Sequence, residues 1–179
     1  EGPYKLPEGW RWVRLEEVAQ VLNGRTPRKT QYAAEATNAK MLKFRDITTT
    51  GEILWDNADN GYVFPDTKWR ETIPGDVLVT SAAHTPEQIG RKVAYLSSVP
   101  SAIDHVYFAG ELAAIRPDGS FLDGRWLYYW LRSRNGFEEV QRHVKEKHLV
   151  KSRAKLIQLP LPPLDEQRRI VARVEELMS

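Results

Sequence analysis

The sequence predicts an α+β fold, in which a twisted, mostly antiparallel sheet or partly open barrel carries flanking helices. Three observations predict it. Short, alternating apolar segments separated by turn residues occupy the middle of the chain, two helical patterns follow them, and a proline-rich segment leads into a last amphipathic helix. At 179 residues the chain fits one domain with an appendage. We therefore expect a folded domain over residues 1–158, a strap over 159–164 and a helix over 165–179.

The N-terminal segment predicts a short helix over Arg14–Leu22. Its apolar residues share one helical face, and Asn23-Gly24 supplies a stop signal; the residues of the face are Leu15, Val18, Ala19 and Leu22. Trp10 and Trp12 precede this segment, and we interpret them as core anchors.

The middle of the chain is predicted to be rich in strands. In the first strand, Leu42 and Phe44 alternate with Lys43 and Arg45, so the two pairs occupy opposite faces. Glycine, proline, asparagine and aspartate place turns at 50–51, 57–60, 74–76 and 118–119. The expected strands are Met41–Ile47, Glu52–Trp55, Val77–Thr80, Lys92–Leu96, Val106–Ala109 and Leu112–Arg116.

The C-terminal third predicts helices over Arg125–Arg134 and Phe137–Val144, then a basic loop over Lys145–Ser152. Pro160, Pro162 and Pro163 favour an extended strap, because proline disrupts a regular helix. Asp165 is the expected N-cap of the last helix. An apolar seam follows at helical spacing, with no second helix of this pattern visible to receive it; its residues are Ile170, Val171, Val174 and Leu177. Because the seam runs to the last residue and the chain lacks an initiator Met, we expect a longer protein.

Composition excludes several classes of protein. Hydrophobic residues make up 41% and charged residues 28%, which is typical of a globular domain. No apolar run approaches membrane-spanning length, and the N-terminus lacks the layout of a signal peptide, so we expect a cytoplasmic protein without a membrane segment. With no cysteine there is no disulfide, and the four histidines lack metal-ligand spacing. Because Gly-rich phosphate loops, nucleophile elbows and zinc-protease motifs are also absent, we expect no catalytic site, no metal and no cofactor.

Charge is unevenly distributed along the chain. Residues 141–155 contain six Lys or Arg and one acid, for a net charge of +5, whereas the remaining residues carry 20 basic and 23 acidic side chains. A local cationic segment on a mildly acidic body is typical of a phosphate-facing surface. A solvated basic face is the equally consistent alternative.

Three polar or basic loops, Gly24–Thr30, Thr80–Arg91 and Lys145–Arg153, are predicted to converge on duplex DNA. The middle loop carries side chains that can bond base edges, and the last loop carries side chains suited to phosphates. For any one of these residues, a solvated loop position explains it equally well. The candidate DNA-binding residues are Arg25, Thr26, Lys29, Lys43, Arg45, Ser81, His84, Thr85, Gln88, Arg91, Lys145, Lys147, His148, Lys151, Ser152 and Arg153.

Three motifs together resemble one family. They are Leu6-Pro7-Glu8-Gly9-Trp10-Arg11-Trp12 with Leu15-Glu16-Glu17-Val18, then Ile73-Pro74-Gly75-Asp76-Val77-Leu78-Val79-Thr80, and Leu159-Pro160-Leu161-Pro162-Pro163-Leu164-Asp165-Glu166-Gln167-Arg168-Arg169-Ile170-Val171. The pattern resembles the DNA specificity subunit of type I restriction-modification systems. In many members Gly-Ser or an Arg follows the central strand, where this chain has Ser81-Ala82-Ala83-His84, so the resemblance leaves the base contacts unassigned.

The resemblance implies a single target recognition domain that reads half of a split double-stranded DNA site and has no catalytic site of its own. It also implies that residues 165–179 begin a spacer helix that docks DNA methyltransferase subunits, which restriction (translocase) subunits then join. A self-dimer through the spacer helix would suit a half-length subunit. Two alternatives stay open: a recognition fragment of a fused methyltransferase-nuclease, and a module that serves protein assembly alone.

Overall fold

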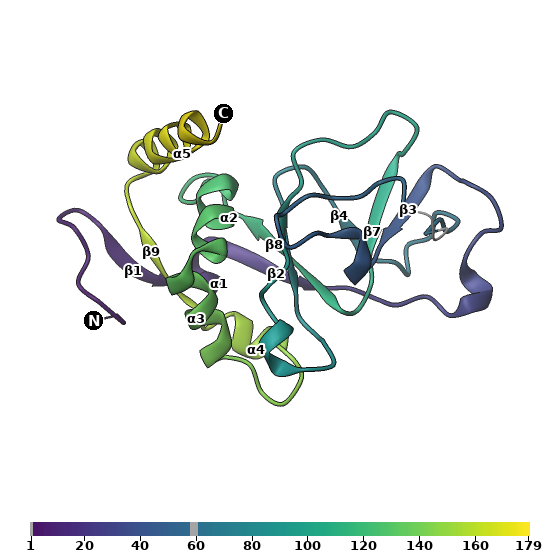
Figure 1. Ribbon diagram of the computed structural model, residues 1–179, viewed down its shortest axis with the longest axis horizontal. Helices are drawn as coiled ribbons and strands as arrows, with labels where there is room; N and C mark the ends of the chain where they lie inside the picture. Colours follow the sequence, from purple (N-terminus) through teal and green to yellow (C-terminus); the bar gives the residue numbers. More distant parts are fainter. Residues whose placement is uncertain (1, 58–60) are drawn as a thin grey trace.

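The computed structural model describes residues 2–57 and 61–179, which form an elongated molecule with helices gathered toward one end (Figure 1). The helices are α1 (Leu15–Val18), α2 (Gly124–Arg132), α3 (Arg134–Arg142), α4 (Lys151–Ala154) and α5 (Leu164–Met178). The strands are β1 (Arg11–Arg14), β2 (Ala19–Asn23), β3 (Ala39–Leu42), β4 (Glu71–Thr72), β5 (Val77–Thr80), β6 (Val93–Tyr95), β7 (His105–Phe108), β8 (Leu112–Pro117) and β9 (Gln158–Leu161). Three 3₁₀ turns cover Lys29–Gln31, Phe44–Asp46 and Pro86–Gln88.

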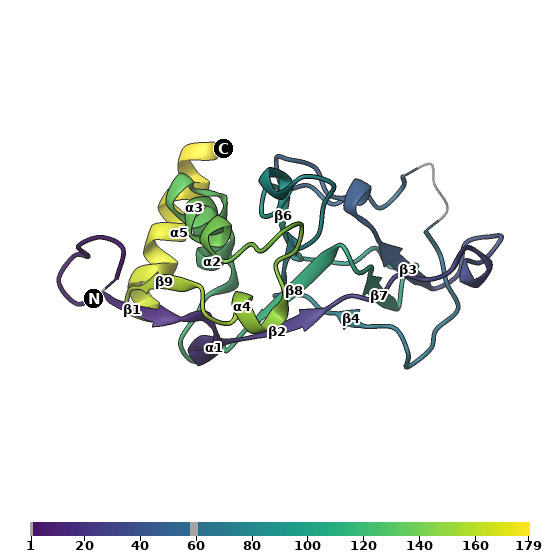
Figure 2. The same ribbon diagram turned by 90° about the horizontal axis from the view of Figure 1, so that it is seen from below.

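The strands form three small sheets rather than a closed barrel. The central sheet has the order β2-β8-β5-β6 and is antiparallel throughout. A second sheet has the order β3-β7-β4, in which β3 and β7 are parallel, and β1 pairs with β9 in an antiparallel ribbon. The ribbon lies beside α5 at one end of the molecule and the β3-β7-β4 sheet lies at the other (Figure 2).

The central sheet is buried on both faces, and this explains the uninterrupted apolar run of β5. Side chains alternate along a strand, so Val77 and Val79 pack in the core formed with α2 and α3. Leu78 packs in the opposite core, with Leu42 and Phe108. The sheet therefore joins the helical end of the molecule to its β-rich end.

The α+β class and the mostly antiparallel sheet are confirmed. The strands expected near Val77–Thr80, Lys92–Leu96, Val106–Ala109 and Leu112–Arg116 are β5 to β8, with small differences at their ends. The helices expected over Arg125–Arg134 and Phe137–Val144 are α2 and α3, which both begin and end slightly earlier than predicted. Trp126 and Trp130 of α2 are buried in the core.

The helix predicted over Arg14–Leu22 is wrong for its second half. Only α1 is helical, and β2 pairs with β8 over five residues, from Ala19 with Pro117 to Asn23 with Ala113. In this strand Val21 packs in one core and Leu22 in the other. Burial on both faces of the sheet therefore outweighs the helical spacing of the apolar residues.

The strands predicted over Met41–Ile47 and Glu52–Trp55 are also wrong in large part. The chain leaves β3 after Leu42 because the Asp46 carboxylate accepts a hydrogen bond from the Lys43 amide at 2.8 Å and stabilises a 3₁₀ turn. Of the second strand only a single bridge remains, between Ile47 and Ile53. The turn predicted at 57–60 lies outside the described residues from 58 onward.

The strap is extended, as predicted, but it is also a strand, and the helix after it begins earlier than expected. The helix α5 starts at Leu164 with Pro163 as its N-cap, and the Pro163 carbonyl accepts hydrogen bonds from Glu166 and Gln167. Asp165 is therefore not the N-cap; it lies in the first turn, where its charge complements the positive end of the helix dipole. Within the described residues no helix is long and apolar enough to cross a membrane.

The helix α5 does have an acceptor within the chain, contrary to the prediction, because it packs against α2. Gln167 is fully buried at this contact: its Oε1 accepts from the Asp123 amide, and its Nε2 donates to the carbonyls of Phe121 and Pro162, at 2.8–2.9 Å. Glu175 accepts hydrogen bonds from Arg125 and Tyr129 of α2. One face of the helix is thus fixed to the domain.

Candidate nucleic-acid interface

The loop over residues 81–91 connects β5 to β6 and is held firmly at its base. The amides of Ser81 and Ala82 both donate to the Glu111 carbonyl, and the Gly90 amide donates to the Thr80 carbonyl at 3.0 Å. Ile89 is fully buried and anchors the loop in the core. The loop therefore projects from the sheet on a fixed base.

Helix α3 packs against the same loop and is hydrogen-bonded to it. The Gln141 side-chain amide donates to the carbonyls of Pro86 and Ile89, at 3.0 and 2.7 Å. Gly90 has a φ of +85°, and a Cβ there would lie 2.9 Å from Cγ1 of Val140. Glycine suits this position because it alone adopts positive φ without strain and leaves room for α3.

The basic segment over residues 145–153 lies directly against this loop. The Leu149 amide donates to the Ser81 carbonyl at 2.7 Å, and the Ala83 amide donates to the Lys147 carbonyl at 3.4 Å. Lys145 and His148 exchange two backbone hydrogen bonds, which close a tight turn between them. The structure thus brings together two of the three loops that the sequence predicts to converge.

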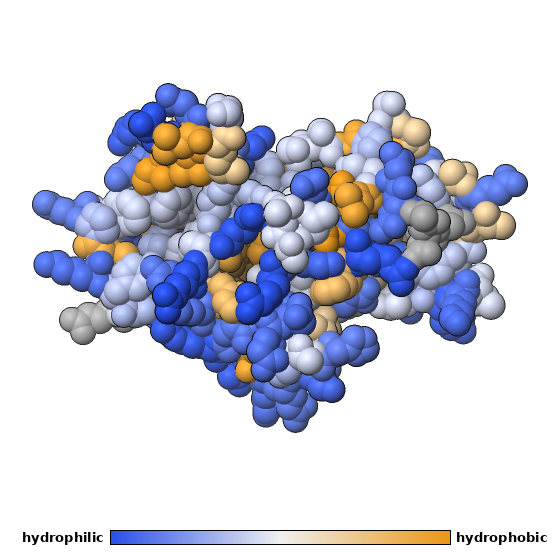
Figure 3. Space-filling model, in the orientation of Figure 1, coloured by the Kyte–Doolittle hydropathy of each residue, from blue (hydrophilic) through white to orange (hydrophobic). Residues whose placement is uncertain are grey.

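The exposed side chains of these two segments include most of the predicted contact residues. His84, Thr85, Gln88 and Arg91 are exposed on the 81–91 loop. On the basic segment the exposed residues are Lys145, Lys147, His148, Lys151 and Ser152, and Arg153 is half-buried. Ser81 is only 8% exposed, and its backbone supports the base of the loop. These two segments lie at the bottom of the view in Figure 3, where the surface is mainly hydrophilic.

A cavity of about 600 Å³ opens beside the 81–91 loop. It is lined by Phe44, Ala82, Ala83, His84, Gln88 and Glu111. The Lys92 ammonium lies 3.7 Å from the centre of the Phe44 ring and donates to the Phe44 carbonyl at 2.9 Å. Burial lowers the pKa of Lys92, and the charge of Asp46 opposes that shift. Sequence reasoning did not identify Phe44 and Glu111, because the partners that bring them to the cavity are distant in the chain.

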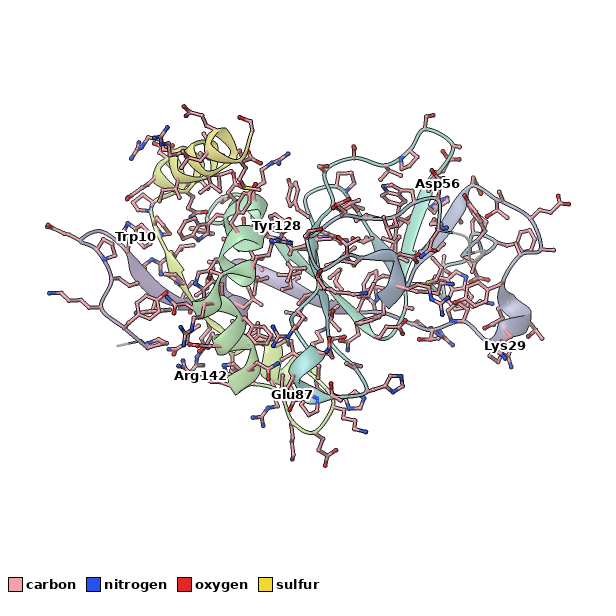
Figure 4. The ribbon with its side chains drawn as sticks, in the orientation of Figure 1. Trp10, Lys29, Asp56, Glu87, Tyr128 and Arg142 are labelled. Atoms are coloured by element: carbon pink, nitrogen blue, oxygen red, sulfur yellow. The ribbon has the colours of Figure 1, made fainter. Side chains whose placement is uncertain are left out.

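The loop over Gly24–Thr30 extends away from the other two. Figure 4 places Lys29 at the far end of the molecule from Arg142, whereas Glu87 lies near the middle of the lower edge. Thr26 accepts a hydrogen bond from the Gly110 amide at 2.9 Å, and Arg25 donates weakly to the Lys68 carbonyl at 3.5 Å. The near part of this loop therefore packs against the turn between β7 and β8, and its far part carries Lys29 outward.

The sequence predicted that Lys43 and Arg45 lie on one face of a strand, and this prediction is wrong. They flank Phe44 in the 3₁₀ turn, and the Lys43 ammonium lies 5.3 Å from the centre of the Tyr32 ring. Arg45 is exposed. In residues 2–57 and 61–179, no three His, Cys, Asp or Glu side chains are grouped to hold a metal ion.

The predicted seam of α5 is divided between two environments. Val171 is 6% exposed and packs in the core, and Ile170 packs against the same core. Val174 is half-buried, but Leu177 and Met178 are 69% and 71% exposed. Figure 3 shows hydrophobic surface on α5, so the last turn presents apolar side chains away from the domain.

Comparison with known proteins places this geometry in context. Residues 7–179 match the family described as the type I restriction modification DNA specificity domain. The chain is 25% identical over 190 residues to the specificity subunit of the type I restriction enzyme EcoAI from Escherichia coli, covering 100% of this chain and 30% of the relative. It is 28% identical over 176 residues to the putative specificity subunit of the type I restriction enzyme MjaX from Methanocaldococcus jannaschii, covering 93% and 39%.

A solved structure shows the same fold. The HsdS subunit from Thermoanaerobacter tengcongensis superposes with a TM-score of 0.70 at 28% sequence identity, covering 99% of this chain and 39% of that subunit. The chain therefore spans between three and four tenths of the length of these relatives.

Proposed function

Because the chain belongs to the type I restriction modification DNA specificity domain family, we propose that it is a target recognition domain that binds double-stranded DNA in a sequence-specific manner. In this proposal residues 1–158 contact DNA, residues 159–164 form the strap, and residues 165–179 form the spacer helix. The 81–91 loop reads base edges, and the 145–153 segment contacts phosphates. The chain carries no catalytic residues of its own and directs the enzymes that join it.

One observation supports this proposal above the others: the backbone hydrogen bonds that join the 81–91 loop to the basic segment. His84 and Gln88 line one cavity, and the loop that carries them is bonded to the segment that carries the exposed Lys147 and Lys151. Amide and imidazole groups suit the pattern of donors and acceptors in the major groove, and ammonium groups suit phosphates. The fixed base of the loop reduces the entropy that binding would otherwise cost.

We further propose that α5 links the domain to its partners. Its inner face is held by Gln167 and Glu175, whereas Leu177 and Met178 are exposed. The partners would be the methyltransferase and restriction subunits of a type I system, or a second copy of the same chain.

Selection from a random pool of duplex DNA tests the recognition function. The chain of residues 1–179 would be immobilised and the bound duplexes sequenced after several rounds at low salt. We expect one short motif to be enriched. A folded chain that recovers duplexes without any enriched motif, or no duplexes, would contradict sequence-specific recognition.

Co-purification tests the assembly function separately. The chain would be co-expressed with a type I methyltransferase subunit of the same organism, and Leu177→Glu/Met178→Glu would be compared with wild type. We expect the double variant to lose the complex while remaining folded. Equal recovery of both chains in the complex would exclude this part of α5 as the docking surface.

A further inference from the structure

A second group of basic side chains lies at the Gly90–Arg91 end of the 81–91 loop, whereas the 145–153 segment is bonded to the other end, at Ser81 and Ala83. This second group surrounds a cavity of about 440 Å³ between that loop and the junction of α2 with α3. Three arginines, Arg91, Arg132 and Arg134, line this cavity, and none of its lining residues is acidic. We name it the arginine cavity. We propose that it binds a backbone phosphate of the DNA strand opposite to the strand contacted by the 145–153 segment; this inference rests on the proposed function.

Two of the three guanidinium groups of the arginine cavity lie over aromatic rings. The Arg91 guanidinium lies 4.5 Å from the centre of the Phe137 ring, and its Nε donates to the Glu87 carbonyl at 3.0 Å. The Arg132 guanidinium lies 5.3 Å from the centre of the Tyr128 ring. A guanidinium that stacks on a ring keeps its edge donors available, and its planar fork matches the oxygens of a phosphate.

The acidic partners near the cavity compete little with a phosphate. Within the described residues Arg132 makes no ion pair, and Arg134 pairs with Glu138 through a side chain that is 90% exposed. Exposed ion pairs of this kind contribute little to stability and exchange readily with another anion. Three positive charges around one cavity raise its local potential, which a phosphate would offset.

The position of the cavity determines which phosphate it would meet. Arg91 belongs to the 81–91 loop itself, three residues after Gln88. At its other end, the loop is bonded through Ser81 and Ala83 to Leu149 and Lys147. A loop that enters the major groove, which is about 12 Å wide, has one sugar-phosphate strand on each side. The two basic groups therefore contact different ends of the loop, and we assign one DNA strand to each.

Binding measurements over a range of salt concentrations test the cavity. Fluorescence anisotropy would follow a labelled duplex that contains the selected motif, with wild type, R132A/R134A and the control R169A/R173A, which removes two exposed arginines from α5. Because each phosphate contact contributes about 0.9 to the magnitude of the slope of log K against log salt, and the cavity is proposed to bind one phosphate, we expect R132A/R134A to reduce that magnitude by up to about 0.9 and the control to leave it unchanged. Equal slopes and affinities for the two double variants would overturn the inference.

Ethylation interference, which reports the contacted phosphates on each strand, tests the assignment of strands. We expect R132A/R134A to lose interference on one strand and K147A/K151A to lose it on the other. Loss on the same strand in both variants would overturn the two-strand arrangement. A folded wild-type chain that binds no duplex would instead overturn the proposed function as well, so the two failures are distinguishable.

Discussion

The strap and α5 differ from the 81–91 loop in what their polar side chains contact. Gln167 is fully buried, and the hydrogen bonds of its side-chain amide are all to backbone atoms of the domain. Gln88 is exposed beside a cavity. One glutamine thus fixes a helix in place, and the other is available to a ligand. The comparison teaches that the motif most useful for identifying the family is a structural one, whereas the proposed DNA contacts lie where no family motif was visible.

Both regions are nevertheless fixed by the same kind of interaction, which is a side-chain amide bonded to backbone carbonyls. Gln167 donates to Phe121 and Pro162, and Gln141 donates to Pro86 and Ile89. In the first case the fixed element is a helix that leads away from the domain. In the second case it is the loop that we propose to read DNA. Four predictions distinguish the residues that stabilise the domain from the residues that we propose to contact DNA.

The largest effect is expected for Gln167→Ala. This change removes the partner of the Asp123 backbone amide and of the carbonyls of Phe121 and Pro162, of which the Pro162 bond is buried and the other two are partly buried. Because a buried polar group left without a hydrogen-bond partner destabilises the fold by about 1–3 kcal/mol, we expect the free energy of unfolding to fall by roughly 3 kcal/mol. Urea denaturation measures it, with Gln88→Ala as the matched control, which we expect to stay within about 0.5 kcal/mol of wild type. Similar losses in both would remove the proposed difference between the two regions.

The next effect is expected for Gly90→Ala. The positive φ and the close approach of Val140 both oppose a Cβ at this position. We expect a loss of about 2 kcal/mol in stability, together with weaker DNA binding because the loop is displaced. Gly119→Ala is the control, since nothing lies within 4 Å of its added Cβ. Wild-type DNA affinity in folded Gly90→Ala would show that the loop does not need this geometry.

A smaller, sequence-independent effect is expected for Lys147→Ala/Lys151→Ala. Both residues are exposed, so stability should change little. Loss of two phosphate contacts should weaken binding to every duplex similarly and lower the salt slope by about 1.8. Anisotropy titrations with the selected duplex and an unrelated one measure both quantities. A loss confined to the selected sequence would argue against phosphate contacts.

The smallest effect in free energy is expected for Gln88→Ala. The discrimination between the selected motif and single-base variants should fall by about 1 kcal/mol at one position, while binding to unrelated duplexes stays the same. Competition titrations with single-base variants would locate that position. Unchanged discrimination at all positions would exclude Gln88 from base reading.

The family resemblance, the fold class and the central strands were predictable from the sequence and are confirmed. Predictions failed where a distant contact decides the local structure. β2 has helical spacing but is held by β8, and the strand after Leu42 ends because Asp46 captures the Lys43 amide. The contribution of Phe44 and Glu111 to the cavity was not predictable either, because three segments far apart in the chain form it. The predicted DNA contacts remain predictions.

The central claim is that the 81–91 loop determines the sequence that is read and that Gln167 determines only the stability of the domain. Selection from a random duplex pool with wild type, H84A/Q88A and Gln167→Ala, at a temperature at which all three are folded, tests it most directly. We predict that H84A/Q88A enriches an altered or relaxed motif and that Gln167→Ala enriches the wild-type motif. An unchanged motif in H84A/Q88A, or a changed motif in Gln167→Ala, would contradict the account.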